Sequence, residues 1–290
     1  MNDSNGTREF AFRIVNVFAE ERLAGNPLAV FENAKGLSDA DMQALALQFN
    51  LSETTFILPS NVADARVRIF TPTFEMPFAG HPTLGSAHVV RKLTGGGDAL
   101  ALEMIAGTIP VIAHGDVWTL EAKAPTARAV NASREELSAM LGLTASELGA
   151  TPLWINTGSE QLVIPLVSAE AVRRCAPNAA LMARHGSVRL DGGATRAMAY
   201  VWAADGPQSI LARFFFPKHG AMVEDPGTGS ACANLGGWLV ATGAALPQQW
   251  TIAQGEFVGR HCKLGLAVGA GGRIFVSGRV IELGRGTIHL

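Results

Sequence analysis

Two stretches of this chain carry the same pattern of residues in the same order, about half the chain apart. Arg-x-Phe-x-Pro begins at Arg68 and again at Arg213, and Pro-x-x-Gly-Ser-Ala begins at Pro82 and again at Pro226. The copies are 145 residues apart at the arginines (213 against 68) and 144 at the prolines (226 against 82), so a single-residue gap aligns them. Chance recurrence of common residues is the alternative. An internal duplication predicts two similar domains whose related sites face one another across a cleft.

Each Pro-x-x-Gly-Ser-Ala segment precedes an apolar run that suits a helix, residues 88–93 in the first copy and 232–242 in the second. A proline-containing turn that enters a helix leaves the first backbone N–H groups without intrahelical acceptors. Glycine allows a ligand to approach the backbone closely, and serine supplies a small hydroxyl. The two segments therefore predict anion sites, and the alignment puts His81 opposite Asp225.

Length and composition limit the class of protein. A chain of 290 residues suggests two domains, and 48% hydrophobic against 17% charged residues indicates a folded core. Lys plus Arg number 23 and Asp plus Glu 25, which argues against nucleic acid or an anionic membrane surface as the main partner. The polar start, residues 1–6, is unlike a signal peptide, and the apolar stretch 236–246 is about half of the roughly 20 residues that cross a bilayer. We expect a cytoplasmic enzyme.

Metal and cofactor signatures are missing from the sequence. The three cysteines, Cys175, Cys232 and Cys262, are an odd set that does not suggest a disulfide framework, and no CxxC pair supports structural zinc. Gly227 and Gly229 lack the third glycine of a dinucleotide fingerprint, and no Gly-Lys-Ser/Thr occurs. We therefore expect neither a metal nor a cofactor.

Three residues are candidates for proton transfer. Glu53 lies between an expected helix and an expected strand, next to Leu51 and Phe56, where desolvation would raise the pKa of its carboxyl. The alternative is a solvated glutamate at a strand end. His81, between glycine and proline, has no evident packing role, and its alternative is a turn histidine. Asp225 precedes a proline, so a turn or N-cap residue is the alternative there.

Hydrophobic periodicity predicts the elements around these candidates. We expect strands at residues 10–18, 28–31, 52–58 and 66–70, and helices at 38–48 and 133–141. Ser38 fits an N-cap, with Asp39 and Asp41 in the first turn, where the helix dipole favours acidic side chains.

The segments that carry these candidates resemble the phenazine-biosynthesis PhzF-like family. They occur in the family's order and span nearly the whole chain, together with Phe18 and a closing segment near residues 278–290. The matching segments are Ala24-Gly25-Asn26-Pro27-Leu28-Ala29-Val30, Leu51-Ser52-Glu53-Thr54-Thr55-Phe56, Phe78-Ala79-Gly80-His81-Pro82-Thr83 and Asp225-Pro226-Gly227-Thr228-Gly229-Ser230-Ala231.

The resemblance implies an α+β, diaminopimelate-epimerase-like fold. Two similar, pseudo-symmetric domains would each wrap a mixed β-sheet around a central helix, with the active site in the cleft between them. The corresponding lobes are residues 1–123 plus 279–290 and residues 124–278. The resemblance also implies cofactor-free proton chemistry on a small carboxylate-bearing substrate, and it is compatible with a homodimer.

The resemblance further implies roles for individual residues. The best-understood member isomerises trans-2,3-dihydro-3-hydroxyanthranilate with a glutamate that carries the proton between carbons, and Glu53 corresponds to it. The family's site histidine and aspartate correspond to His81 and Asp225. Its anion contacts correspond to Gly80, Gly229 and Ser230.

Related amino-acid epimerases use two cysteines, one at the start of each central helix, and neither motif here contains one. This favours an isomerase with Glu53 as general acid and base over a two-thiol racemase. Two alternatives stay open. One is an amino-acid-type epimerase in which Glu53 works with His81 or Asp225 opposite, and the other is a small-acid-binding protein that has kept the fold and lost the chemistry.

Overall fold

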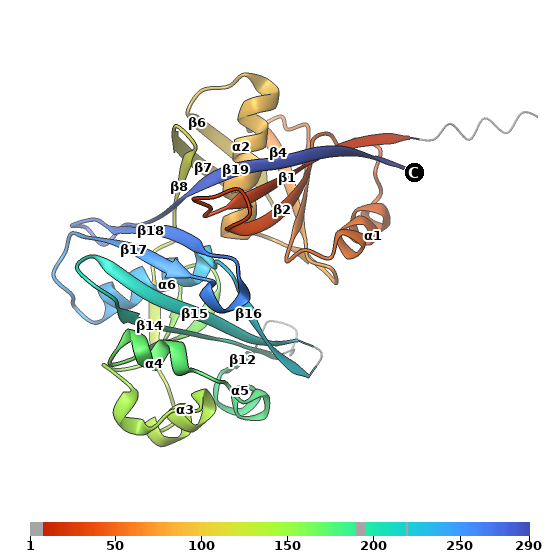
Figure 1. Cartoon of the computed structure of the whole chain (residues 1–290). Helices are drawn as coiled ribbons and strands as arrows, with labels where there is room; N and C mark the ends of the chain where they lie inside the picture. Colours follow the sequence, from red (N-terminus) through yellow and green to blue (C-terminus); the bar gives the residue numbers. More distant parts are fainter. Residues whose placement is uncertain (1–7, 190–194, 219) are drawn as a thin grey trace, which may run out of the picture. The chain divides into compact units, whose positions relative to one another are not determined.

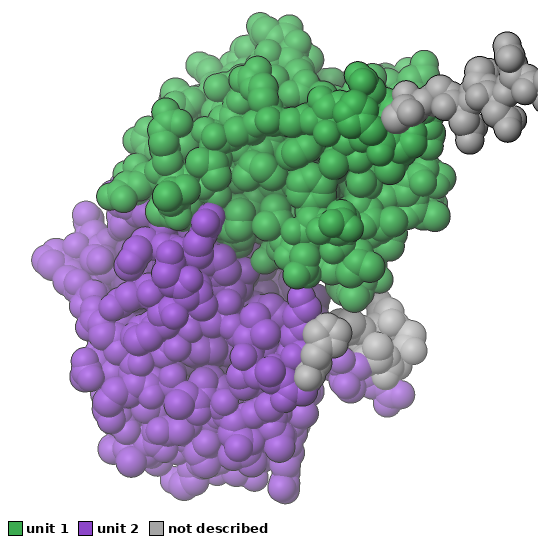
Figure 2. Space-filling model, turned by 45° about the vertical axis from the view of Figure 1, so that its right-hand side comes forward, with its two compact units in different colours: residues 1–120, 278–290 green, residues 121–277 purple. Residues whose placement is uncertain are grey.

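The chain folds into two compact units, which Figure 2 colours separately. The structure, a computed structural model, describes residues 8–189, 195–218 and 220–290, so the polar start at residues 1–6 lies outside the described residues. Unit 1 comprises residues 1–120 and 278–290, and unit 2 comprises residues 121–277. The lobes expected from the sequence have limits that differ from these by at most three residues (123 against 120, 279 against 278).

Unit 1 consists of short strands and two helices (Figure 1). Its elements are β1 (Glu9–Val17), β2 (Asn26–Phe31), α1 (Asp39–Phe49), β3 (Thr54–Leu58), β4 (Ala65–Phe70), β5 (Glu75–Met76), α2 (Gly80–Thr94), β6 (Ala99–Met104), β7 (Gly107–His114), β8 (Val117–Glu121) and most of β19 (Ile274–His289). The four strands and the helix predicted in this half are confirmed, with shifted ends. Ser38 caps α1 as predicted, because its hydroxyl accepts from the Asp41 N–H and its own N–H donates to the Asp41 carboxylate.

The sheet of unit 1 closes on itself around α2. Antiparallel and parallel pairs run from β1 through β2, β3, β4, β6 and β7 to β8, and β19 pairs with both β8 and β1. All eleven residues of α2 from Gly80 to Val90 are buried. A Cβ at Gly85 would lie 2.6 Å from Leu28 Cδ2, so only glycine allows the helix to pack this close to β2.

Unit 2 repeats this plan with more helices at its periphery. Its elements are β9 (Thr126–Ala129), α3 (Arg134–Leu141), a 3₁₀ turn η1 (Ala145–Glu147), β10 (Leu153–Asn156), β11 (Glu160–Pro165), α4 (Ala169–Arg174), α5 (Ala179–His185), β12 (Ser187–Arg189), β13 (Thr195–Ala197), β14 (Ala199–Ala204), β15 (Ser209–Lys218), β16 (Ala221–Asp225), α6 (Gly229–Ala241), β17 (Gln248–Gln254), η2 (Glu256–Val258), β18 (Cys262–Val268) and the start of β19. The helix predicted at 133–141 is α3, capped by Ser133. In the part of the chain that the structure describes, no helix has the length and apolar character of a membrane span.

The two units pair their strands in the same order. In unit 1 the order is β1 antiparallel to β2, β2 parallel to β3, β3 antiparallel to β4 and β4 parallel to β6. In unit 2 the same sequence of pairings joins β10, β11, β14, β15 and β17. The enclosed helix, α2 or α6, follows the short hairpin strand β5 or β16 in each unit.

The repeated Arg-x-Phe motif has the same structural role in both units. Arg68 binds Glu75 through two hydrogen bonds of 2.7 and 2.6 Å, and Arg213 binds Glu224 in the same two-pronged way at 3.1 and 2.7 Å. Each glutamate faces the phenylalanine of its motif across the hairpin, Phe70 opposite Glu75 and Phe215 opposite Glu224. The motif therefore clamps a hairpin that leads into the enclosed helix.

The predicted alignment is wrong at the start of the helices. α2 begins at Gly80 and α6 at Gly229, a spacing of 149 rather than 144, so His81 matches Ser230 in position and not Asp225. In the first copy the segment from Pro82 is not a turn but lies inside α2. Proline is tolerated there because a residue in the first helical turn needs no intrahelical N–H bond.

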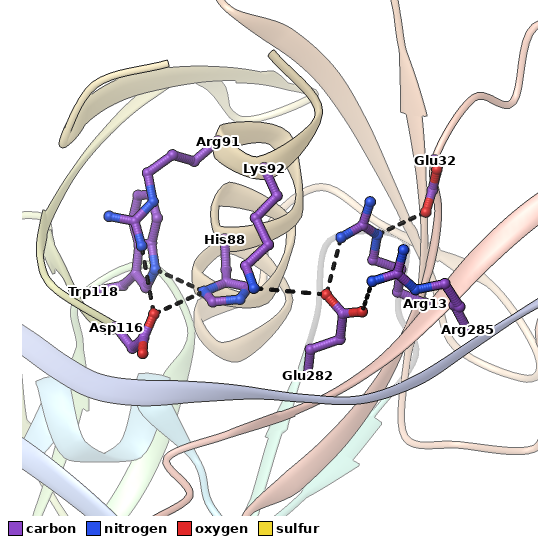
Figure 3. A network of polar contacts seen from close by, with 9 residues as sticks. All are labelled: Arg13, Glu32, His88, Arg91, Lys92, Asp116, Trp118, Glu282 and Arg285. Carbon is purple, nitrogen blue, oxygen red and sulfur yellow. Dashed lines mark hydrogen bonds and ion pairs between the residues drawn. The ribbon is translucent and has the colours of Figure 1, made fainter. Parts of the chain in front are cut away.

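A buried histidine on α2 belongs to a polar network that Figure 3 shows. The His88 side chain is 2% exposed, and its Nδ1 accepts from Trp118 Nε1 at 3.4 Å. The pKa of His88 is lowered to about 4, mainly by burial. Lys92 and Arg91 contribute to this shift, while Asp116 and Glu282 oppose it. Protonation of Nδ1 would also remove the acceptor of the indole N–H. His88 is therefore neutral in the folded protein at neutral pH.

This burial predicts a loss of stability in mild acid. The unfolded chain binds a proton at His88 below about pH 6.5 and the folded chain only near pH 4. The free energy of unfolding should therefore fall between these values, by up to about 3 kcal/mol from this residue. In His88→Gln, the amide oxygen can accept from Trp118, and the free energy of unfolding should fall less steeply with pH than in wild type. Urea unfolding at pH 7, 5.5 and 4.5 measures this. The exposed control His261→Gln should follow the wild type, and parallel curves for wild type and His88→Gln would contradict the prediction.

Candidate functional site

Glu53 lies in the short connection between α1 and β3 of unit 1. The helix ends at Asn50, which adopts the left-handed conformation (φ 50°) and turns the chain toward β3. Glu53 comes directly before the first strand residue, Thr54, and its side chain is 15% exposed. The helix end and the strand start thus hold the carboxyl at a mostly buried place.

His81 is the second residue of α2 and lies against Glu53. Its Nε2 is 3.4 Å from Glu53 Oε2, and its side chain is 7% exposed. Burial lowers the pKa of His81 to about 3, so the ring is neutral near pH 7. The contact therefore joins a neutral imidazole to a carboxyl and is not an ion pair.

Asn26 fixes which nitrogen of His81 carries the proton. Asn26 Nδ2 is 3.5 Å from His81 Nδ1, and an amide nitrogen can only donate. Nδ1 of the neutral ring is then the acceptor, and Nε2, which is 3.4 Å from Glu53 Oε2, carries the hydrogen. Asn26 was named from the sequence in a family-like segment but was given no role. The signal that could have found it is an asparagine next to an apolar strand, and the structure shows that Asn26 is fully buried at the start of β2.

The start of α2 next to His81 has no side-chain cap. Ala79 is the N-cap residue, and the first turn contains no acidic residue. Gly80, the first helical residue, is buried, and the Ala79 carbonyl accepts from the Thr83 N–H at 3.2 Å. The positive end of the helix dipole therefore has no protein carboxylate in its first turn, which suits an anion.

In unit 2, Asp225 ends β16 and stands before the start of α6. Thr228, the N-cap residue of α6, donates its hydroxyl proton to Asp225 Oδ2. Gln254 accepts from the Thr228 N–H at 3.3 Å and donates from Nε2 to Thr228 Oγ1 at 3.0 Å and to the Asp225 carbonyl at 2.9 Å. Because Thr228 Oγ1 accepts from Gln254, its proton is directed to Asp225, and Asp225 Oδ2 acts as an acceptor.

Gly229 and Ser230 are the first two residues of α6. Gly229 is buried and Ser230 is half-buried, and Ser230 Oγ accepts from Gln161 Nε2 at 2.9 Å. The structure thus brings Glu53, His81 and Gly80 together in unit 1, and Asp225, Gly229 and Ser230 together in unit 2. Gln161, Thr228 and Gln254 were not singled out from the sequence, since only long-range strand pairing brings them to α6.

The three cysteines are poorly suited to react as thiolates. Cys175, Cys232 and Cys262 are buried and unpaired by disulfides. Burial raises the pKa of the Cys175 thiol to about 12 and raises the other two thiol pKa values as well. Among the described residues, no group of three or more His, Cys, Asp and Glu side chains is arranged to hold a metal ion.

Comparison with known proteins identifies the fold and the family of the chain. The fold is shared with a hydroxyproline epimerase from Agrobacterium vitis (TM-score 0.66, 12% identity, 100% of this chain and 94% of that one) and with a PhzF family protein from Bacillus anthracis (TM-score 0.84, 22% identity, 97% and 99%). The family model described as "phenazine biosynthesis-like protein" matches residues 15–282. The chain belongs to this PhzC-PhzF family.

Several relatives in the family match over nearly their full length. The trans-2,3-dihydro-3-hydroxyanthranilate isomerases of Pseudomonas aeruginosa and Pseudomonas chlororaphis are 35% and 37% identical to this chain, each over 96% of it and 98% of the relative. An uncharacterized isomerase of Pasteurella multocida is 38% identical over 97% of this chain and 94% of the relative.

The buried thiols predict that the native protein resists thiol reagents. With raised thiol pKa values and no solvent access, none of the three cysteines should react with Ellman's reagent within an hour at pH 8. Unfolding in guanidinium should release three reactive thiols, which serves as the positive control. A thiol that reacts rapidly in the native protein, with loss of ligand binding, would contradict this assignment of the cysteines.

Proposed function

We propose that the chain is a cofactor-independent isomerase that moves a proton between carbons of a small carboxylate-bearing substrate of the trans-2,3-dihydro-3-hydroxyanthranilate type. Glu53 is the general acid and base, His81 orients its carboxyl, and Asp225 accepts a hydrogen bond from the substrate. Gly80, Gly229 and Ser230 bind anionic oxygen. The proposal assigns all of these groups to one substrate.

The observation that carries the proposal is the contact of the Glu53 carboxyl with a neutral, buried imidazole at 3.4 Å. A neutral imidazole next to Glu53 does not hold the carboxyl in its charged form as the positive partner of an ion pair would. The carboxyl therefore remains able to take a proton and to release it. The identity of 35% and 37% to two named isomerases over almost the whole chain supports the same reaction class.

The proton balance of the reaction is closed within the site. Glu53 removes a proton from one carbon of a conjugated substrate, and the electron pair left behind delocalises toward the substrate carboxylate. Backbone N–H groups at the two helix starts and the Ser230 hydroxyl stabilise that charge. Glu53 then returns the same proton to another carbon, so that no oxidant, reductant or co-reactant is needed. We propose accordingly that the enzyme works without metal or cofactor.

Glu53→Gln should abolish turnover and keep ligand binding. The amide is close in size to the carboxyl but cannot accept the proton, so turnover should fall by roughly 10²- to 10⁴-fold. The measurement is conversion of trans-2,3-dihydro-3-hydroxyanthranilate, together with exchange of substrate hydrogen in D₂O. Glu135→Gln, an exposed glutamate on α3, is the matched control and should keep full activity.

Turnover by Glu53→Gln at the wild-type rate would eliminate the proposed role. Exchange with inversion at a single centre would instead support the epimerase alternative. Binding of the acid by wild type with neither conversion nor hydrogen exchange would support the silent binding protein.

The neutral state of His81 predicts a particular pH profile. Because the pKa of His81 is about 3, its protonation cannot produce an inflection of kcat/KM near pH 6.5. His81→Asn should lower kcat/KM at every pH and leave the acidic inflection where it is in the wild type. An inflection near pH 6.5 that disappears in His81→Asn would show instead that a protonated imidazole takes part.

A further inference from the structure

A buried chain of side-chain amides runs beneath the start of α6, and the backbone fixes its direction. Asn234 Oδ1 accepts from the Thr157 N–H at 2.9 Å and from the Thr157 hydroxyl at 2.7 Å. Asn234 Nδ2 donates to the Ser159 carbonyl at 2.8 Å and to Gln161 Oε1 at 2.8 Å. Gln161 Nε2 then donates to Ser230 Oγ at 2.9 Å.

The orientation of both amides follows from these partners. A backbone N–H can only donate and a backbone carbonyl can only accept, so Thr157 and Ser159 together exclude a flipped Asn234. Asn234 in turn requires Gln161 to present its oxygen to Asn234 and its nitrogen to Ser230. Asn234 is fully buried and Gln161 is 3% exposed, so water does not compete for these groups.

This direction determines what the Ser230 hydroxyl can do. The hydroxyl has one proton, and its oxygen already receives a hydrogen from Gln161. Its own proton must therefore point away from Gln161, and within the described residues no acceptor is placed for it. The proton of the Ser230 hydroxyl is therefore available to a ligand acceptor, such as a carboxylate oxygen.

We propose that Gln161 and Asn234 are positioning residues that hold Ser230 as a hydrogen-bond donor to an anionic oxygen of the substrate. The inference rests on the proposed function for the identity of the ligand, whereas the direction of the amide chain rests on the contacts alone. A carboxylate oxygen is bound at this place through the proton of the Ser230 hydroxyl.

Gln161→Glu reverses the direction with almost no change in size. A carboxylate at this position accepts from Asn234 as the glutamine does, but it also accepts from Ser230 and so draws the hydroxyl proton away from the ligand. The probes are 3-hydroxyanthranilate, an aromatic acid with the functional groups of the proposed substrate, and 2-aminophenol, which lacks the carboxylate. We expect calorimetry to show about 10-fold to 100-fold weaker binding of 3-hydroxyanthranilate by Gln161→Glu, the range of a lost bond to a charged group. Binding of 2-aminophenol should change little.

A double-mutant comparison separates positioning from simple charge repulsion. Ser230→Ala should weaken 3-hydroxyanthranilate binding to a similar extent, and adding Gln161→Glu to it should weaken binding less than about twofold further. If Gln161→Glu weakened the binding of 3-hydroxyanthranilate equally in wild type and in Ser230→Ala, the proposal would be overturned, because the introduced charge would then act on the ligand directly. Gln161→Met, which removes the donor without adding charge, should cost less than Gln161→Glu, and thermal melts of all variants test that they fold.

A second measurement tests the amide chain without any ligand. The Gln161 side-chain NH₂ signals, identified by their loss in Gln161→Glu, should be protected from solvent exchange in wild type and shift in Ser230→Ala. Gln161 NH₂ signals that do not shift in Ser230→Ala would overturn the proposal. If these signals behave as expected but wild type binds no 3-hydroxyanthranilate, the proposed function fails and the direction of the amide chain is supported.

Discussion

Enclosing a helix within a sheet is the constraint on which the rest of unit 1 depends. Every residue of α2 from Gly80 to Val90 is buried, so the polar side chains in this part of the helix are largely desolvated as well. Burial is the main cause that keeps both His81 and His88 neutral. The fold therefore sets the protonation state of the imidazole beside Glu53.

In unit 2, amide side chains fix the direction of the hydrogen bonds at the start of α6. Gln254 sends the Thr228 proton to Asp225, and Gln161 sends the Ser230 proton away from itself. One helix start thus presents an acceptor at Asp225 and a donor at Ser230. A substrate with a carboxylate and a hydroxyl or amino group meets both requirements, which is the pattern of groups in a hydroxyanthranilate.

Local sequence signals predicted the strands, α1, α3 and the hairpin motif, because capping, alternation and the Arg-x-Phe pattern act over a few residues. The alignment of the two enclosed helices could not be predicted in the same way. Small residues recur along both helices wherever the sheet comes close, as at Gly85 and Gly237. Aligning the two Gly-Ser-Ala motifs therefore shifted one helix against the other by five residues from the match of their first residues, Gly80 and Gly229. Asn26 and Gln161 were missed because their partners lie 55 and 69 residues away in the sequence.

The geometry also bears on the choice between isomerase and racemase. A racemase needs a base and an acid on opposite faces of one carbon, and the enclosed helices here offer no thiol for either role. Cys232, the fourth residue of α6, is buried with a raised thiol pKa. Asp225 Oδ2 already accepts a hydrogen bond from the Thr228 hydroxyl. A single carboxyl that both removes and returns the proton is then the simplest chemistry. Such a carrier keeps the proton on one face of the substrate, which suits migration between two carbons and not inversion at one.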